Sequence, residues 1–141
     1  MNIYTKNNIK YPYSHISQNI RISVKTDFLD SQSDEENNLW VWSYDILIEN
    51  KGTIKIQLLD RHWIITDETG HVEEFKGVGV IGQQPTINPG NYFQYTSGAP
   101  LKRPSGFMTG SYNMINEIKK SFKIEIPTFS LDLPLKKRIL N

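Results

Sequence analysis

Apolar and polar residues alternate over short stretches of this chain, and this period of two restricts its fold more than any other feature. Between Ile20 and Val24, for example, every second residue is apolar and the residues between are polar. Strict alternation is typical of a β-strand with one buried and one solvent-facing side. The alternating stretches predict seven strands, at residues 16–28, 39–50, 54–66, 71–76, 92–96, 107–116 and 122–133.

Turn signals rich in glycine and proline separate these stretches. Asn50-Lys51-Gly52 has the composition of a hairpin turn, and Asn88-Pro89-Gly90 places glycine where a type II turn needs positive φ. No stretch of ten residues has a helical period. The pattern therefore predicts an all-β fold, an antiparallel β-sandwich of the immunoglobulin-like or fibronectin type III kind. The chain has no cysteine, so the immunoglobulin disulfide is absent and the fibronectin-like variant is favoured.

The 141 residues fit one domain, residues 1–141, with an ordered core from about residue 16 to about residue 131. An extended lead-in of residues 1–13 precedes this core, and a short basic tail of residues 135–141 follows it. The first ten residues lack the apolar segment of a secretory signal, and no apolar run is long enough to span a bilayer. The net charge of +1 gives no general attraction to nucleic acids or membranes. We therefore expect a cytoplasmic protein that binds neither.

Irregular backbone is predicted at three places. Apolar residues change parity between Leu58 and Trp63, so a bulge or bend is expected at residues 59–62. Pro127 interrupts the last strand, which indicates an edge strand or a second bulge. Residues 97–106 contain two prolines and are expected to form a long loop.

Two segments allow both a structural and a functional interpretation. Trp40, Trp42 and Tyr44 occupy every second position of one strand. Such a ladder is most often the core strand of a sandwich, and the alternative is a platform on which bases stack. Residues 30–38 form an acidic run without apolar residues. A solvated loop is the simplest interpretation, and the alternative is a site whose carboxylates hold Mg²⁺ or Ca²⁺.

Gly77, Gly79 and Gly82 match the G-x-G-x-x-G fingerprint of dinucleotide binding. In that fold the glycines precede a helix whose N-terminus holds the pyrophosphate. Two prolines within residues 83–89 exclude a helix here. A weaker hypothesis is that the loop turns backbone N–H groups inward as a nest for phosphate. The structural alternative is that the glycines allow positive φ or a close approach of the backbone.

Positive charge would support a phosphate site at this loop. Lys76, Lys102 and Arg103 would supply it if residues 77–82 and 98–106 meet in space. The candidate phosphate- or nucleotide-binding residues are therefore Gly77, Gly79, Gly82, Lys102 and Arg103.

No catalytic or metal-binding constellation is evident. The three histidines, His15, His62 and His71, form no pair with the spacing of a metal site. For His62, a hydrogen-bonded structural role is favoured over that of a ligand or general base. No G-x-S-x-G nucleophile motif occurs. We therefore assign no catalytic residue, no metal ligand and no cofactor.

Five motifs follow one another along the chain. They are Arg61-His62-Trp63-Ile64-Ile65-Thr66-Asp67, Gly77-x-Gly79-Val80-x-Gly82-x-Gln84-Pro85, Pro89-Gly90, Tyr95-Thr96-Ser97-Gly98 and Pro104-x-Gly106-x-Met108-x-Gly110-x-Tyr112. Each motif is weak, but the ordered combination is specific and resembles the ApaG domain family of ApaG/CorD-like proteins. The resemblance extends from about residue 16 to about residue 131. The family is similar to fibronectin type III folds, in agreement with the predicted sandwich.

The resemblance implies a small bacterial cytosolic protein from a family associated with cobalt tolerance and magnesium efflux. In eukaryotic relatives the domain occurs in F-box and polymerase-interacting proteins, where it resembles a protein-binding module. It also implies that Gly77, Gly79 and Gly82 correspond to a suggested pyrophosphate site for nucleotides. Lys102 and Arg103 are more basic than the family pattern at these positions.

Three functions are ranked on this basis. The first is a non-enzymatic module that binds an unknown protein partner in Mg²⁺/Co²⁺ homeostasis. The second is binding of nucleotide or dinucleotide polyphosphates, or of pyrophosphate, through residues 77–82. The third is an enzyme such as a polyphosphate hydrolase, which needs a metal or histidine centre. Its nearest candidate residues are Asp60, His62, Asp67 and Glu73. Unpaired strand edges also leave a homodimer open.

Overall fold

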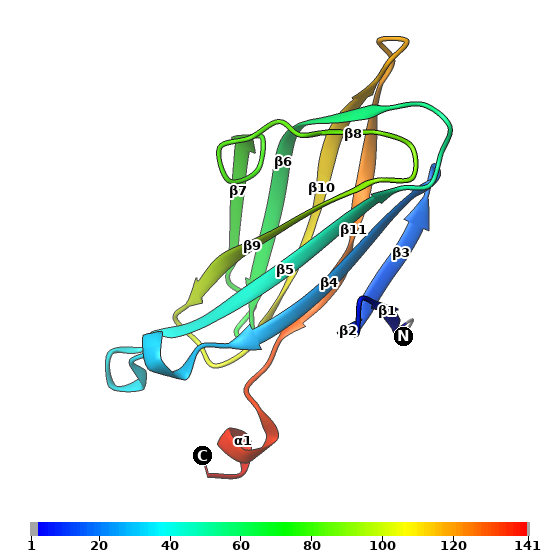
Figure 1. The fold of residues 1–141 in the computed structure, drawn as a ribbon. Helices are drawn as coiled ribbons and strands as arrows, with labels where there is room; N and C mark the ends of the chain where they lie inside the picture. The colour runs from blue at the N-terminus through cyan, green and yellow to red at the C-terminus, as the bar shows by residue number, and fades with distance from the viewer. Residues whose placement is uncertain (1–2, 141) are drawn as a thin grey trace.

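Alternating apolar residues pack between two antiparallel sheets in the computed structural model, which describes residues 3–140 (Figure 1). One sheet has the order β3-β4-β5-β9, formed by Tyr13–Ser17, Ile20–Phe28, Trp40–Asn50 and Tyr92–Leu101. The other has the order β11-β10-β6-β7, formed by Ser121–Leu131, Gly106–Asn116, Ile56–Asp67 and Val72–Val78. A short strand, β8 (Thr86–Ile87), also pairs with β6. The predicted antiparallel β-sandwich is confirmed. Within the described residues its sheets contain more strands than predicted, because β3 and β4 are separate and β8 is added.

The core consists of aromatic and branched side chains from the inner faces of the two sheets. Trp42 and Ile48 of β5 are fully buried. At the centre, the Phe129 ring lies 5.8 Å from the rings of both Tyr44 and Trp63. Buried aromatic residues contribute much of the hydrophobic stabilisation of a small domain. The aromatic ladder of β5 is therefore part of the core, as predicted.

Two of the irregularities predicted in the strands are bulges. In β6 the extra residue is Leu59, because its neighbours Leu58 and Asp60 pair with consecutive residues of β10. In β11, which is an edge strand, the register shifts at Pro127, opposite Thr109. An extra residue moves the following side chains to the other face of the sheet. The bulges therefore keep the apolar residues on both sides of them in the core.

The predicted loop at residues 97–106 is wrong over its first half. Strand β9 continues past Pro100, and the loop is reduced to residues 102–105. The hydrogen bond from Asn50 N–H to the Asn91 carbonyl shows that the odd-numbered residues of β9 direct their N–H and C=O groups toward β5. The even-numbered residues direct these groups away from β5. The nitrogen of Pro100 therefore faces the free edge of the sheet, where a proline removes no ladder bond.

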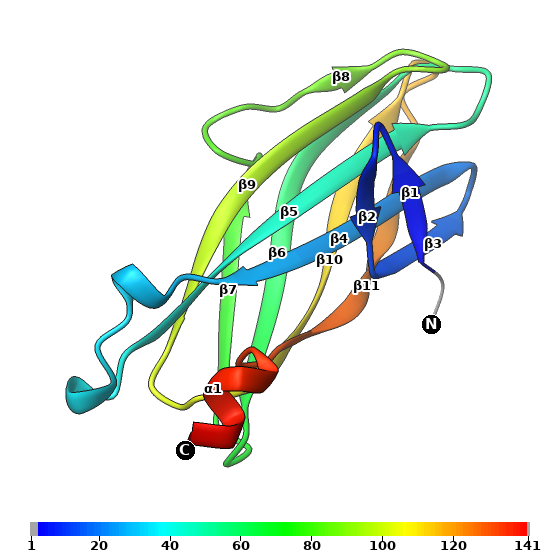
Figure 2. The same ribbon diagram turned by 60° about the horizontal axis from the view of Figure 1, so that its bottom comes forward.

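The first part of the predicted lead-in is a hairpin. Strands β1 (Tyr4–Lys6) and β2 (Ile9–Tyr11) pair with each other and lie on the outer face of the four-stranded sheet (Figure 2). The turn residues Asn7 and Asn8 have positive φ, 53° and 66°, which is the conformation of a type I′ turn. The Asn-Asn pair was therefore the signal for this hairpin, although its short strands show no clear period.

A buried carboxylate holds this hairpin on the sheet. Glu49 of β5 has a side chain only 3% exposed, and it accepts hydrogen bonds from Lys6 Nζ at 2.7 Å and the Tyr4 hydroxyl at 3.2 Å. Lys51 Nζ lies 3.4 Å away and Arg21 Nε 4.0 Å away. Burial alone would raise the pKa of Glu49. The hydrogen bond from Lys6 and the charges of Lys51 and Lys6 outweigh burial, so this pKa lies below its usual value of 4.5.

Acid should weaken the attachment of this hairpin. Because folding lowers the pKa of Glu49, the carboxylate stabilises the fold above pH 4.5, and this contribution is lost as the pH falls through the lowered pKa. We expect Glu49→Gln to lower the free energy of unfolding by about 1–3 kcal/mol at neutral pH, since it removes a buried carboxylate from its hydrogen bonds and leaves the half-buried Lys6 without its partner. Urea unfolding at neutral and acidic pH measures this, and the difference between the two proteins should shrink in acid.

Glu125→Gln is the matched control for this measurement. Glu125 forms an exposed ion pair of 3.6 Å with Lys123, and its loss should change the free energy of unfolding by less than about 0.5 kcal/mol. Equal effects of the two substitutions at neutral pH would contradict the role given to Glu49.

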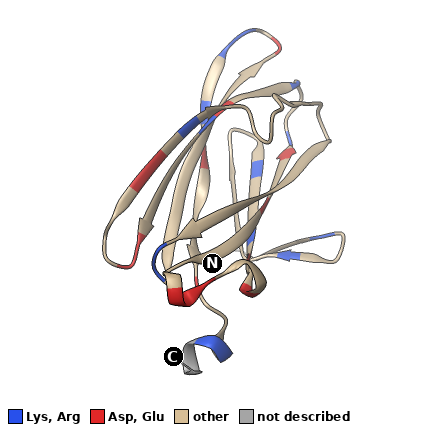
Figure 3. Ribbon diagram, turned by 90° about the vertical axis from the view of Figure 1, so that its left-hand side faces the viewer, with Lys and Arg blue, Asp and Glu red and all other residues tan. Residues whose placement is uncertain are grey.

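The acidic run and the basic tail contact each other. The acidic run forms two 3₁₀ turns, at Asp30–Gln32 and Glu35–Asn37. The basic tail forms a short helix, α1 (Leu135–Leu140). Lys137 Nζ of α1 lies 3.0 Å from a carboxylate oxygen of Asp30 and 3.1 Å from one of Glu35. Figure 3 shows the blue basic part of α1 at the same end of the molecule as red acidic segments. The acidic run is thus a surface loop, as predicted, and the tail neutralises part of its charge. Across residues 3–140, no helix is both long and apolar enough to cross a membrane.

Candidate binding cleft at one end of the sandwich

Strand β7 separates the two groups of predicted phosphate-binding residues. Gly77 lies in β7, and the loop with Gly79 and Gly82 follows it, at the end of the sandwich where β8 lies (Figure 1). Lys102 and Arg103 lie in the β9–β10 loop at the opposite end, near the β6–β7 turn. The structure therefore does not bring the glycines and the basic pair together, and Gly77 and Lys102 line different pockets. Phosphate binding at these residues stays a prediction.

Backbone groups of the glycine loop form hydrogen bonds within the chain. The N–H of Gly79 donates to the Leu59 carbonyl at 2.8 Å, and Val80 and Gln83 exchange two bonds of 2.9 Å. Gly79 has a φ of +65°, and a Cβ at this position would lie 2.1 Å from the Gln83 carbonyl oxygen. The fold itself therefore requires glycine at position 79.

The same loop surrounds the positively charged guanidinium group of Arg61, which comes from the neighbouring strand β6. Arg61 Nη1 donates to the carbonyl oxygens of Gly79 at 2.7 Å and Val78 at 3.2 Å. The Arg61 guanidinium carbon would lie only 2.8 Å from a Cβ at Gly77, so the missing side chain at position 77 makes room for it. Carbonyl oxygens that converge on one point attract positive charge, whereas a phosphate nest needs converging N–H groups.

At the opposite end, Asp67 shapes the β6–β7 turn. Its Oδ1 accepts hydrogen bonds from the Thr69 hydroxyl at 2.6 Å, the Thr69 N–H at 2.8 Å and the His71 N–H at 3.2 Å. The hydrogen bond from the Thr69 hydroxyl is the largest cause of a lowered pKa of Asp67. Side-chain bonds to the following backbone are typical of aspartate in turns, and they leave this carboxylate ionised at neutral pH.

The β6–β7 turn contacts the β9–β10 loop directly. The N–H of Glu68 donates to the Ser105 carbonyl at 3.0 Å, and the Ser105 hydroxyl donates to the Glu68 carboxylate at 3.3 Å. Strand pairing supports the same arrangement, since Asp67 at the end of β6 pairs with Gly106 at the start of β10. These contacts fix the two segments beside each other.

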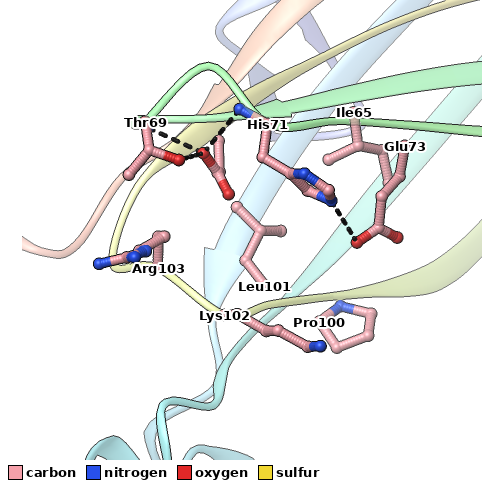
Figure 4. Close-up of a pocket in the computed structure, with 9 residues that line it drawn as sticks. Ile65, Thr69, His71, Glu73, Pro100, Leu101, Lys102 and Arg103 are labelled. Carbon is pink, nitrogen blue, oxygen red and sulfur yellow. Dashed lines mark hydrogen bonds and ion pairs between the residues drawn. The ribbon is translucent and has the colours of Figure 1, made fainter.

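A cleft of about 340 Å³, which we call the end cleft, lies between these segments (Figure 4). Asp67 and Glu73 line its acidic side, Lys102 and Arg103 line its basic side, and Leu101 lies between them. The other lining residues are Ile65, Thr69, His71 and Pro100. A segment with an apolar side chain between charges of both signs can form ion pairs with both walls of such a cleft.

The other two residues considered for an enzyme lie on the outer face of the five-stranded sheet. His62 Nε2 and Glu74 Oε1 are 2.6 Å apart, and Asp60 accepts a hydrogen bond of 2.7 Å from the Asn113 amide. His62 is thus hydrogen-bonded, and its structural role stays a prediction. In the part of the chain that the structure describes, no group of three or more aspartate, glutamate or histidine side chains is placed to hold a metal ion.

Sequence reasoning did not recognise the end cleft, because its lining residues come from two predicted strands, the segment between them and the predicted loop at residues 97–106. Thr69, His71 and Leu101 were not candidates. The direction of the strands could have indicated that these segments meet. Antiparallel pairing of β6 with β10 places the end of one strand beside the start of the other, so the segments attached there share one end of the sandwich.

Known proteins resemble this chain in sequence and in structure. The family model of the ApaG domain matches residues 30–116. The chain is 50% identical over 129 residues to Protein ApaG of Bradyrhizobium diazoefficiens, covering 92% of this chain and 99% of that protein. It is 52% identical over 122 residues to Protein ApaG of Maricaulis maris, covering 86% and 94%. A crystal structure of a Bordetella pertussis protein named ApaA is 40% identical, has a TM-score of 0.80, and covers 82% of this chain and 94% of that one.

Proposed function

Because this chain belongs to the ApaG domain family, we propose that it is a non-enzymatic binding module that acts through a protein partner in Mg²⁺ and Co²⁺ homeostasis. The link to cobalt tolerance and magnesium efflux comes from the family resemblance. A segment of the partner occupies the end cleft.

The charge arrangement of the end cleft is the observation that carries the proposal. Glu73 and Lys102 represent its two walls, and Leu101 lies between them. Complementary charges on both sides of an apolar contact fix the position and the direction of a bound segment. The bonds between Glu68 and Ser105 hold the two walls together, so a partner would find the cleft already formed.

Binding of nucleotide polyphosphates at residues 77–82 is the second candidate. It receives less support, because the N–H groups of Gly79, Val80 and Gln83 bond within the chain. The Arg61 guanidinium also occupies the carbonyl-lined side of the loop. An amide NMR titration with pyrophosphate, ATP and diadenosine tetraphosphate, with and without Mg²⁺, tests this candidate. Saturable shifts confined to the loop would place it first.

Charge reversal in the end cleft tests the protein-binding proposal. The double variant Lys102→Glu/Arg103→Glu makes both walls acidic, and we expect it to bind the partner at least about tenfold more weakly. Affinity capture from the source cell with the wild-type chain identifies the partner, and titration of that purified protein gives the dissociation constants. In a strain that lacks the gene, the variant should also fail to restore cobalt tolerance.

Lys119→Glu/Lys120→Glu is the matched control, because it reverses two adjacent lysines in the β10–β11 turn at the other end of the sandwich. It should bind the partner like the wild type. Equal binding by both double variants would refute a role of the end cleft. Equal cobalt tolerance in cells with and without the gene would refute the link to metal homeostasis.

A further inference from the structure

Strand β7 leaves one edge of the five-stranded sheet unpaired. It is the last strand in the order β11-β10-β6-β7, and its residues from Val72 to Lys76 are all exposed. Phe75 and Val78 are apolar and 49% and 74% exposed. An exposed edge strand with apolar side chains is a template for pairing with another strand.

The backbone of β7 presents a regular set of hydrogen-bonding groups at this edge. At the two ends of the ladder, Gly79 N–H donates to Leu59 and Asp67 N–H donates to His71. Odd-numbered residues of β7 therefore form the hydrogen-bonded pairs with β6, because such pairs alternate along an antiparallel ladder. The even-numbered residues from Val72 to Val78 direct their N–H and C=O groups toward the free edge.

We propose that two copies of this chain associate by antiparallel pairing of their β7 strands, with Phe75 on the two-fold axis. In this register Val72 pairs with Val78 of the second copy, and Glu74 pairs with Lys76. All of these residues have even numbers, so each Glu74–Lys76 pair can exchange two backbone hydrogen bonds. In the Val72–Val78 pairs the Val78 carbonyl already accepts a bond of 3.2 Å from Arg61, so it would share its oxygen between two donors. The association joins the two five-stranded sheets edge to edge and does not depend on the function proposed for the end cleft.

The side chains of β7 are complementary to themselves in this register. Opposite charges meet in each Glu74–Lys76 pair, and apolar residues meet at the axis and at both ends of the strand. The two Phe75 residues form a non-hydrogen-bonded pair, in which side chains approach most closely. Glu73 lies opposite Gly77, over which the Arg61 guanidinium is placed, so an acid meets a base there as well.

Neighbouring registers lack this complementarity. An axis at Glu74 would place two glutamates directly opposite each other, and an axis at Lys76 would do the same with two lysines. Like charges opposite each other destabilise strand pairs. The charge pattern of β7 therefore selects Phe75 as the centre and a second copy of this chain as the occupant of the edge.

Sedimentation over a wide concentration range tests this association. The interface is one strand long, so the wild type should be a dimer at high concentration and dissociate on dilution. Glu74→Lys and Lys76→Glu each create two pairs of like charge, and each should weaken the dimer about tenfold. A wild type that stays monomeric up to millimolar concentration would overturn the proposal.

A mixture of the two variants gives the sharper result. In a heterodimer of Glu74→Lys with Lys76→Glu, every pair of positions 74 and 76 again carries opposite charges. The mixture should therefore dimerise about as well as the wild type, although each variant alone does not. No gain of association on mixing would refute the register, because loss of contacts within one chain cannot explain recovery on mixing.

The strand β11 supplies a matched control. Lys123 and Glu125 have the same spacing as the pair in β7, and their charged atoms are 3.6 Å apart, compared with 3.7 Å between Lys76 and Glu74. Glu125→Lys should leave dimerisation unchanged. Weakening equal to that of Glu74→Lys would show a general effect of charge and overturn the assignment to β7.

Single cysteines report the register directly, because the natural chain has none. Two copies of Phe75→Cys would face each other across the axis at a separation suited to a disulfide. Two copies of Glu73→Cys would be about 13 Å apart along the strands. Under mild oxidation, Phe75→Cys should form covalent dimers much faster than Glu73→Cys. Equal rates would indicate random collision and refute the proposed axis.

Discussion

Replacing Phe129 with alanine should lower the free energy of unfolding by about 3–5 kcal/mol, or the melting temperature by about 10–20 °C. Phe129 is 1% exposed, and its ring contacts those of Tyr44 and Trp63 in the middle of the core. Alanine would leave a cavity between the two sheets, whose strands are fixed by their hydrogen bonds and cannot close it. Urea and thermal unfolding measure the loss.

Phe107→Ala is the control, because it removes the same side chain from a position on the surface. Phe107 lies on β10, the strand next to β11, but its side chain is on the surface and 43% exposed. Its replacement should lower the free energy of unfolding by less than about 1 kcal/mol. Similar losses for both variants would contradict the central place of Phe129 in the core.

Gly79→Ala should be the most harmful single change in the glycine motif. We expect the free energy of unfolding to fall by about 3–4 kcal/mol, because a Cβ strains the positive φ and meets the Gln83 carbonyl oxygen at 2.1 Å. Gly82→Ala is the matched comparison. Gly82 has a φ of +76° but no atom within 4 Å of a Cβ, so only backbone strain of about 1 kcal/mol applies. Thermal unfolding of the two variants under identical conditions separates the clash from the strain.

Equal stability of these two variants would mean that the loop can move away from the added methyl group. If Gly79→Ala is the less stable, a loss of ligand binding in a Gly79 variant reports on folding before it reports on recognition. Gly82→Ala is then the better choice for testing phosphate binding at this loop.

The alternation of apolar and polar residues was sufficient to predict most of the strands, because one face of a sandwich strand is buried in the core and the other faces solvent. The bulge at Leu59 was also predictable, since apolar residues of opposite parity in one strand can face the same core only if an extra residue lies between them. The hairpin at residues 4–11 was missed, because three-residue strands show no period and only Asn7-Asn8 indicated the turn. The length of β9 was missed because Pro100 stops a strand only where its nitrogen is needed for pairing.

The candidate site was less predictable than the fold, because contacts between distant segments create it. Lys102 and Arg103 were recognised as basic residues, but their place beside Asp67 depends on the pairing of β6 with β10. The role of Gly77 depends on Arg61, a residue on the neighbouring strand. A motif read along the chain shows neither neighbour, which is why the glycines suggested an anion site and the structure places a cation there.

The strand order also determines which strands of the nascent chain lack a pairing partner during synthesis on the ribosome. Strand β6 pairs with β7 soon after both emerge, but its other neighbour is β10, where Asn116 pairs with Ile56. Between the synthesis of residue 67 and that of residue 116, β6 therefore has one side that is not fully paired, and the inner face of its sheet is incomplete. Long-range pairing slows folding, and unpaired strands in partly folded chains associate with one another. We therefore expect the nascent chain to be most prone to aggregation in this interval, before β10 covers the second side of β6.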